Sequence, residues 1–313
     1  MFVTLGDSLT NANMFIINHR GFFFWLTGLL LVGAVGAILL WGLPLGIDFT
    51  GGSLMQVNYE KTRPALADIQ KQVDTVSLGT VSVRAVGDNG ISIRARTITP
   101  AEHTSVLSAI STNASTTELA YTSVGPALGG QFTNKALWAI FAVMLVIVLY
   151  IAFAFRHVSK PVPSWGYGLT VVAMLAIDII VPAGFFAAFC HFTGAEVDSL
   201  FVVALLALLG YCVNDVIVIF DRIREHLARN EKMGIHESFE ETIGKSINET
   251  MTRSINTALT VVLALVALIY FGAPATRDFA LVMLVGVAAG TFSSICRSAP
   301  LLIPIANWFN KGK

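Results

Sequence analysis

The sequence predicts an α-helical, polytopic membrane protein with six transmembrane helices and a small α+β domain between the first two. Of its 313 residues, 55% are hydrophobic and only 13% are charged, and the mean hydropathy is +0.71. These values are typical of a membrane protein and not of a soluble one. The 40 charges are also unevenly placed, with 14 in residues 44–135 and 13 in residues 221–253. The chain therefore combines long apolar stretches with two hydrated segments.

Six apolar runs are long enough to cross a hydrocarbon core, which takes about 20 helical residues. The predicted spans are residues 22–43, 136–155, 165–189, 200–220, 255–272 and 279–304. The first run exceeds the roughly 7–15 apolar residues of a cleavable signal peptide, so we expect it to remain as an anchor.

Lys and Arg in short loops predict the orientation, because such loops resist translocation. They gather before span 1, after span 2, between spans 4 and 5, and at the end of the chain: Arg20, Arg156, Lys160, Arg222, Arg224, Arg229, Lys232, Lys245, Arg253, Lys311 and Lys313. The short loops on the opposite side carry only Arg277. We therefore expect both termini in the cytoplasm and three regions: 1–43 with the first helix, 44–135 outside, and 136–313 with five further helices.

The outer segment changes from helical runs to short alternating ones. Strands are predicted at 53–59, 80–86, 90–96 and 117–124, and amphipathic helices that begin with proline at 64–73 and 100–110. The resulting order βαββαβ is the ferredoxin-like pattern.

Composition and motifs exclude several function classes. A net charge of zero argues against a nucleic-acid partner. No phosphate-binding loop, HExxH motif or nucleophile elbow occurs, so we expect no enzyme activity, no cofactor and no metal. The three cysteines lie in or beside apolar runs without ligand spacing and are expected to be packing residues.

Two carboxylates stand inside predicted spans, Asp178 in the third and Asp215 in the fourth. An ionisable residue at this depth is costly and is by default a candidate for a proton or ion pathway. The alternative is a neutral carboxylic acid in a packing contact. Asn214 points about 100° away from Asp215 along the helix and favours an interhelical hydrogen bond. From spacing alone, Arg253 at the start of the fifth span is a positive anchor.

Glycine-rich motifs flank the outer domain. The first contains Gly46, Asp48, Gly51 and Gly52, and the second begins with Gly125 and Pro126. Glycine permits backbone angles closed to other residues, so these ends are candidate hinges, with ordinary turns as the alternative.

Two further patterns lie among the later spans. Residues 221–253 mix charges with periodic apolar positions, which predicts an interfacial amphipathic helix in two pieces broken at Gly234. Gly286 and Gly290 in the last span have the spacing of a close helix–helix contact.

Several motifs together resemble the SecF family of protein-export membrane subunits, within the SecD/SecF group of the RND superfamily. They are GIDFTGG at 46–52, SVGP at 123–126, AIDII at 176–180, GYCVND at 210–215 and SINETMTRSINT at 246–257. The resemblance covers almost the whole chain. Two positions depart from it: Cys212 stands where a small hydroxyl residue is common, and Arg297 where an apolar residue is more usual. Arg297 leaves the depth of the last span open, because a charge near the membrane centre costs at least about 2.5–3.5 kcal/mol unless it snorkels to an interface.

The resemblance implies a subunit of the bacterial cytoplasmic (inner) membrane that acts with SecD, the SecYEG channel, YajC and a translocating preprotein. It implies coupling to protons through Asp215, with Asp178 assisting, and gives Arg253 a relay role. Two alternatives stay open at this point: a proton-driven RND-type exporter of small molecules, and a non-conducting membrane scaffold.

Overall fold

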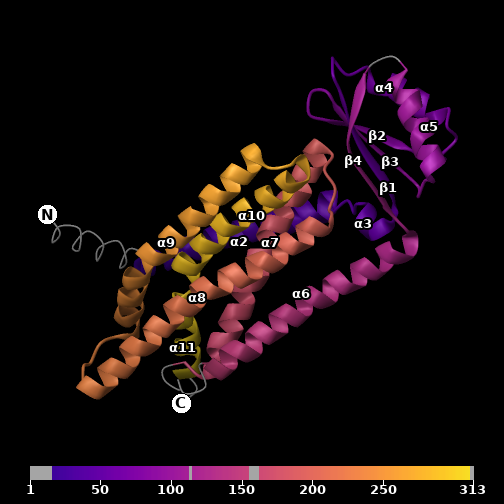
Figure 1. Cartoon of the computed structure of the whole chain (residues 1–313). Helices are drawn as coiled ribbons and strands as arrows, with labels where there is room; N and C mark the ends of the chain where they lie inside the picture. The colour runs from indigo at the N-terminus through magenta and orange to yellow at the C-terminus, as the bar shows by residue number, and fades with distance from the viewer. Residues whose placement is uncertain (1–15, 113–114, 155–161, 311–313) are drawn as a thin grey trace. The chain divides into compact units, whose positions relative to one another are not determined.

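The computed structural model describes residues 16–112, 115–154 and 162–310 (Figure 1). The chain divides into two compact units. One comprises residues 43–138 together with 192–199, and the other comprises the described parts of 1–42, 139–191 and 200–313. Four of the cations used to predict the orientation, Arg156, Lys160, Lys311 and Lys313, lie outside the described residues.

Six helical segments are long and apolar enough to cross a membrane, as predicted. They are α2 (Arg20–Trp41), α6 (Pro126–Ala154), α7 (Ser164–Thr193), α8 (Ser199–Met233), α9 (Phe239–Phe271) and a final segment. This last segment consists of α10 (Pro274–Ser293), a π-helical turn η1 (Ser294–Ser298) and α11 (Leu302–Asn310).

The charged segment 221–253 does not form a helix of its own. Its two halves extend α8 and α9, because the apolar periodicity of each helix continues into the segment and only residues 234–238 are non-helical. The predicted break is confirmed at Gly234, which has φ +62°. Ser238 then starts α9 with a capping box, in which its hydroxyl accepts from the Glu241 N–H and Glu241 accepts from the Ser238 N–H. Helix α6 also differs, since it begins at Pro126, ten residues before the predicted span.

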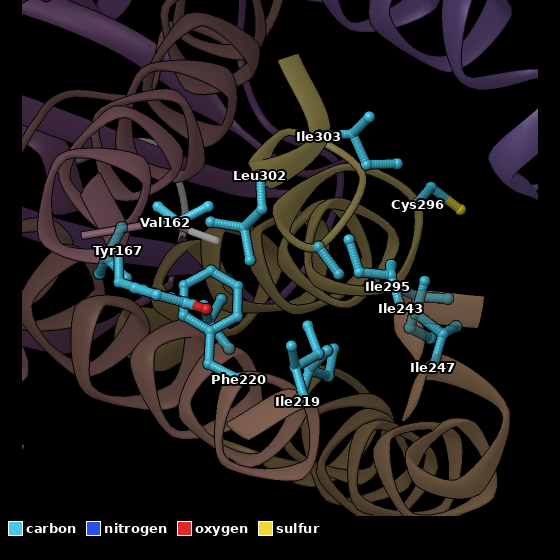
Figure 2. Close-up of a cluster of buried hydrophobic side chains, with 14 of the residues drawn as sticks. Val162, Tyr167, Ile219, Phe220, Ile243, Ile247, Ile295, Cys296, Leu302 and Ile303 are labelled. Atoms are coloured by element: carbon cyan, nitrogen blue, oxygen red, sulfur yellow. The ribbon is translucent and has the colours of Figure 1, made fainter. Parts of the chain in front are cut away.

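The helical unit is held by a buried apolar cluster, part of which Figure 2 shows. Its side chains come from α7, α8, α9, η1 and α11: Tyr167, Ile219, Phe220, Ile243, Ile247, Ile295, Leu302 and Ile303 are among them. The rings of Tyr167 and Phe220 meet edge to face, with centroids 5.4 Å apart and an interplanar angle of 75°. Ile243 and Ile247 place the first turns of α9 in this core, which explains why the charged segment is ordered as an extension of the span.

The two glycines of α10 make the close contact that their spacing predicts. A Cβ atom on Gly286 would lie 2.2 Å from Leu208 Cδ1, and one on Gly290 would lie 2.4 Å from the Cys212 sulfur. Real Cβ atoms do not approach so closely, so a larger residue at either position would have to displace the buried Leu208 or Cys212 side chain of α8.

The smaller unit contains a short helix α3 (Ile47–Thr50) and a four-stranded sheet in the chain order strand–helix–strand–strand–helix–strand. Its elements are β1 (Gly52–Tyr59), α4 (Leu66–Asp74), β2 (Ser82–Val86), β3 (Gly90–Ala95), α5 (Pro100–Ser111) and β4 (Thr116–Val124). The strand order is β2-β3-β1-β4 and every pair is antiparallel. All four strands were predicted within two residues.

The helices α4 and α5 bury their apolar faces with residues of the sheet. Ile69 and Val73 from α4, and Val106 and Ile110 from α5, join a core with Met55, Val57, Ile91 and Ile93 from the strands. Helix α5 starts at Pro100 as predicted, after a Thr99–Glu102 capping box. Helix α4 starts at Leu66, two residues after the predicted Pro64, because Ala65 is still extended with ψ 136°.

Candidate functional site

A buried ion pair joins two of the long helical segments. Asp178 lies in the middle of α7, and Arg297 lies in η1. Arg297 Nη2 donates to Asp178 Oδ1 at 3.3 Å, and the two side chains are only 5% and 3% exposed. The open question about Arg297 is thereby answered: this side chain does not snorkel but is buried against a carboxylate.

Irregular backbone supports both members of the pair. Arg297 is part of a π-helical turn, a feature often found at functional sites. Its guanidinium also donates to the Ser293 hydroxyl, one helical turn earlier. On the other side, Pro182 has no N–H to donate to the carbonyl of residue 178, four positions earlier in α7. The carbonyl of Asp178 therefore has no N–H donor at the usual position four residues later in the helix.

The second carboxylate, Asp215, has a different environment. It is half-buried in α8, and its Oδ1 accepts a hydrogen bond from the hydroxyl of Ser254 in α9. Ser254 itself is 2% exposed. The hydrogen-bond donor to Asp215 is therefore a neutral hydroxyl, whereas the donor to Asp178 is a charged guanidinium.

The pairs Asp178–Arg297 and Asp215–Ser254 together form a polar cluster. The remaining residues considered from the sequence lie around this cluster. Arg253 is exposed, next to Ser254 but on a different face of α9, and Asn214 is exposed on α8. Cys212 is fully buried beside the Asp178 carboxyl and lies one helical turn before Asp215. The structure thus brings Asp178 together with Arg297 and Asp215 together with Ser254. Sequence reasoning missed Ser254 and Ser293, whose hydroxyls carry no distinctive pattern.

Several buried polar atoms of the cluster have no hydrogen-bond partner among the residues that the structure describes: Asp178 Oδ2, Asp215 Oδ2, Ser294 Oγ and Arg297 Nε. Buried polar groups are normally satisfied, so these atoms identify a polar site inside the helical unit. No group of three or more His, Cys, Asp or Glu suited to a metal occurs in the described part of the chain. The arrangement suits proton exchange within an otherwise apolar helical bundle.

The first glycine motif has a defined place in the smaller unit. Gly46 precedes α3, and its N–H donates to the Val197 carbonyl at 2.8 Å. The Val197 N–H donates in turn to the Pro44 carbonyl at 2.8 Å. Asp48 accepts at Oδ2 from the N–H of Ser199, the first residue of α8, at 2.8 Å. The motif thus binds the loop 192–199 through its backbone and caps a long helix through its carboxylate.

Two arginines of the sheet bind the same loop. Glu196 forms ion pairs with Arg84 of β2 at 3.2 Å and with Arg94 of β3 at 2.9 Å. Arg84 also donates to the Gly194 carbonyl at 3.0 Å. Sequence reasoning did not single out Glu196, although the loop 192–199 carries two acidic residues, Glu196 and Asp198, and no Lys or Arg.

The other motif glycines allow close backbone approaches. Gly51 has φ +75°, and a Cβ there would lie 2.7 Å from Pro126 Cα. Gly52 has φ +124°, and its Cβ would lie 2.7 Å from the Ala95 carbonyl oxygen. Gly125 has open space around it and is followed directly by α6. These positions place the two ends of the domain in contact, while their action as a hinge remains a prediction.

Comparison with known proteins identifies the family. The family model described as "Protein export membrane protein SecD/SecF, C-terminal" matches residues 104–308, and the model described as "SecD/SecF GG Motif" matches residues 42–62. The chain belongs to the SecF family. A protein translocase subunit SecF from Thermobaculum terrenum is 38% identical over 95% of this chain and 94% of its own length. The subunit of the same name from Anaerolinea thermophila is 33% identical over 95% and 97%.

Solved structures agree with the family. The translocon-associated membrane protein SecDF from Thermus thermophilus superposes with a TM-score of 0.79 at 28% identity. SecDF in a super-membrane-facing form superposes with a TM-score of 0.64 at 26% identity. These matches cover 94% and 95% of this SecF-family chain but only 38% and 39% of the SecDF chains.

Proposed function

We propose that this SecF-family chain, a subunit of the Sec protein-export machinery, couples proton entry through its membrane helices to preprotein translocation. The observation that carries the proposal is the buried polar cluster of Asp178, Arg297, Asp215 and Ser254. Ionisable groups inside membrane helices are expensive and are typical of proton pathways. In the proposal the protons drive the cycle and the chain needs no ATPase motif of its own.

The partner that we propose is SecD. The chain spans 38% of the length of the solved SecDF protein, and in this proposal SecD corresponds to the part that the chain does not match. Three helices are also poorly covered within this chain, since α2, α6 and α9 bury only 11%, 6% and 11% of their most apolar windows. Lipid and a second membrane subunit would cover them. SecYEG, YajC and the emerging preprotein are expected partners of the assembled complex.

We place the protein in the bacterial cytoplasmic membrane with both termini inside and the sheet-containing domain in the periplasm. The order βαββαβ and the antiparallel arrangement β2-β3-β1-β4 support a ferredoxin-like fold for that domain. Movement of this domain, allowed by its glycine-rich ends, would engage the preprotein.

The energy scale suits such a mechanism. One charge that crosses 100 mV releases about 2.3 kcal/mol. That free energy shifts a two-state equilibrium by about fifty-fold, enough to bias a domain between two positions. Asp215 would take up and release the proton. Arg253, one residue from the serine that binds Asp215, would modulate its charge.

The test is protein export in cells whose only copy of this subunit carries Asp215→Asn, measured with and without a proton-gradient uncoupler. We expect normal assembly and loss of the gradient-dependent part of export. Asp221→Asn is the matched control, because Asp221 lies on the same helix in an exposed pair with Arg224 that contributes little. Undiminished gradient-dependent export in the Asp215 variant contradicts the relay and favours a scaffold. Loss of small-molecule efflux with intact export favours an exporter.

A further inference from the structure

The two carboxylates of the cluster, Asp178 and Asp215, differ in the groups that bind them. Asp178 is paired with the guanidinium of Arg297, and both side chains are at least 95% buried. Asp215 is half-buried and is held by the hydroxyl of Ser254. A charge in a low-dielectric interior must be paired or neutralised, and a guanidinium stabilises a carboxylate far better than a neutral hydroxyl does.

The charge balance of the cluster then points to a single exchangeable proton. Arg253, the cation that acts on Asp215 from α9, is exposed, so among the buried groups two ionised carboxylates and one guanidinium leave one negative charge without a buried counter-ion. One proton removes that charge. Since Asp178 already has its cation, the proton belongs on Asp215. The other groups near Asp178 are the Cys212 thiol of α8 and the Ser293 hydroxyl of α10, and neither supplies a charge in the carboxylate form of the pair.

We propose that Arg297 is a fixed internal cation that keeps Asp178 ionised, so that Asp178 is a positioning residue for the proton exchange assigned above to Asp215. This assignment deepens the proposed function and rests on it. It gives the two carboxylates different roles, whereas the sequence placed both in the relay. The ion pair joins α7 to η1, and the proton site joins α8 to α9.

The pair predicts a distinctive pattern among variants. Removal of one partner leaves an uncompensated buried charge, whereas removal of both is often tolerated. Asp178→Asn and Arg297→Gln should each reduce gradient-dependent export and lower the melting temperature of the purified full-length protein. The double variant Asp178→Asn/Arg297→Gln should recover both. Arg297→Lys should retain most activity, because the present contact uses one guanidinium nitrogen and not the two-pronged geometry.

The matched control is the combination of Asp215→Asn with Arg297→Gln. Because Arg297 does not contact Asp215, this double variant should stay without gradient-dependent export. Asp178→Leu/Arg297→Met provides a second, apolar replacement of the pair in case amides pack poorly there.

Both readouts can overturn the proposal. If both double replacements of the pair are stable but lack gradient-dependent export, Asp178 itself carries protons and the assignment is wrong. If the single and double variants lose stability additively, the two side chains are not coupled and the assignment is also wrong. Failure of the underlying function looks different: the wild-type protein would then show no gradient-dependent export, while the stability coupling of the pair would persist.

Discussion

The Asp48 carboxylate of the glycine motif should stabilise the first turn of α8. Its carboxylate accepts the N–H of Ser199 at 2.8 Å, and the first N–H groups of a helix have no partner within the helix. Removal of a capping side chain costs about 0.5–2 kcal/mol, and loss of a negative charge at a helix N-terminus costs about 0.3–1 kcal/mol. For Asp48→Ala we therefore expect about 1–2 kcal/mol, which corresponds to roughly 5–30-fold faster opening of the first turn of α8.

The assay is amide hydrogen exchange of the full-length protein in lipid nanodiscs, followed in the peptide that covers residues 192–203. Asp48→Asn is the internal control, since its amide oxygen still accepts the hydrogen bond and only the charge is lost. We expect it to accelerate exchange by at most about five-fold. The cap has no energetic role if Asp48→Ala exchanges like the wild type in this peptide. If the alanine and asparagine variants exchange equally fast, the hydrogen bond contributes nothing and only the charge acts.

Three further predictions concern packing, ion pairs and pH. Gly290→Leu should destabilise the helical unit by about 1–3 kcal/mol through the clash with Cys212, with a lower melting temperature in detergent that Cys212→Ala partly restores; an unchanged melting temperature contradicts the close packing. Glu196→Gln should speed exchange in the loop 192–199 modestly, because its two partly exposed ion pairs contribute about 0.2–1 kcal/mol each, and 1 M salt should reduce the difference from the wild type; a salt-independent effect refutes an electrostatic role. Hydrogen bonds from Arg96 and from the Thr99 backbone lower the pKa of Glu102 to about 2; because this value lies below the unfolded pKa of about 4.3, the stabilisation of α5 is present above about pH 4.3 and is lost as the pH falls towards 2. Protection of the first turn of α5, expressed relative to the intrinsic amide exchange rate at each pH, should fall over that window in the wild type and not in Glu102→Gln, and equal pH profiles would exclude the capping carboxylate.

Elements whose residues carry a strong period were predictable from the sequence. The six spans follow from uninterrupted apolar runs, and β1 to β4 follow from alternation bounded by turn residues. The boundaries were less predictable, because charges do not end a helix. Residues 221–233 stay helical since Ile223 and its neighbours continue the buried stripe of α8, and the helix ends only where Gly234 adopts a positive φ.

The candidate site was predictable in its members but not in its pairing. Asp178, Asp215 and Arg297 each stood out as charges within apolar runs. That Arg297 meets Asp178 depends on the packing of segments 119 residues apart and on a π-helical turn. An inserted residue in a helix leaves no local pattern, so the direction of the Arg297 side chain could not be read from its position. The contacts of Glu196 were hidden for the same reason, because they depend on the fold of residues more than a hundred positions away.

Because α8 extends beyond its apolar part, it is longer than the membrane is thick, and a small tilt would displace both of its ends. Its 35 residues give a rod of about 52 Å, whereas the hydrocarbon layer is about 30 Å thick. Asp215 lies near the middle of the rod, Ser199 is bound at one end by Asp48, and the other end turns at Gly234 into α9. A tilt of about 5° about the centre of such a rod displaces each end by about 2 Å, in opposite directions. Under the proposed function, a change of charge at Asp215 would therefore displace the two ends of α8 without any change in secondary structure.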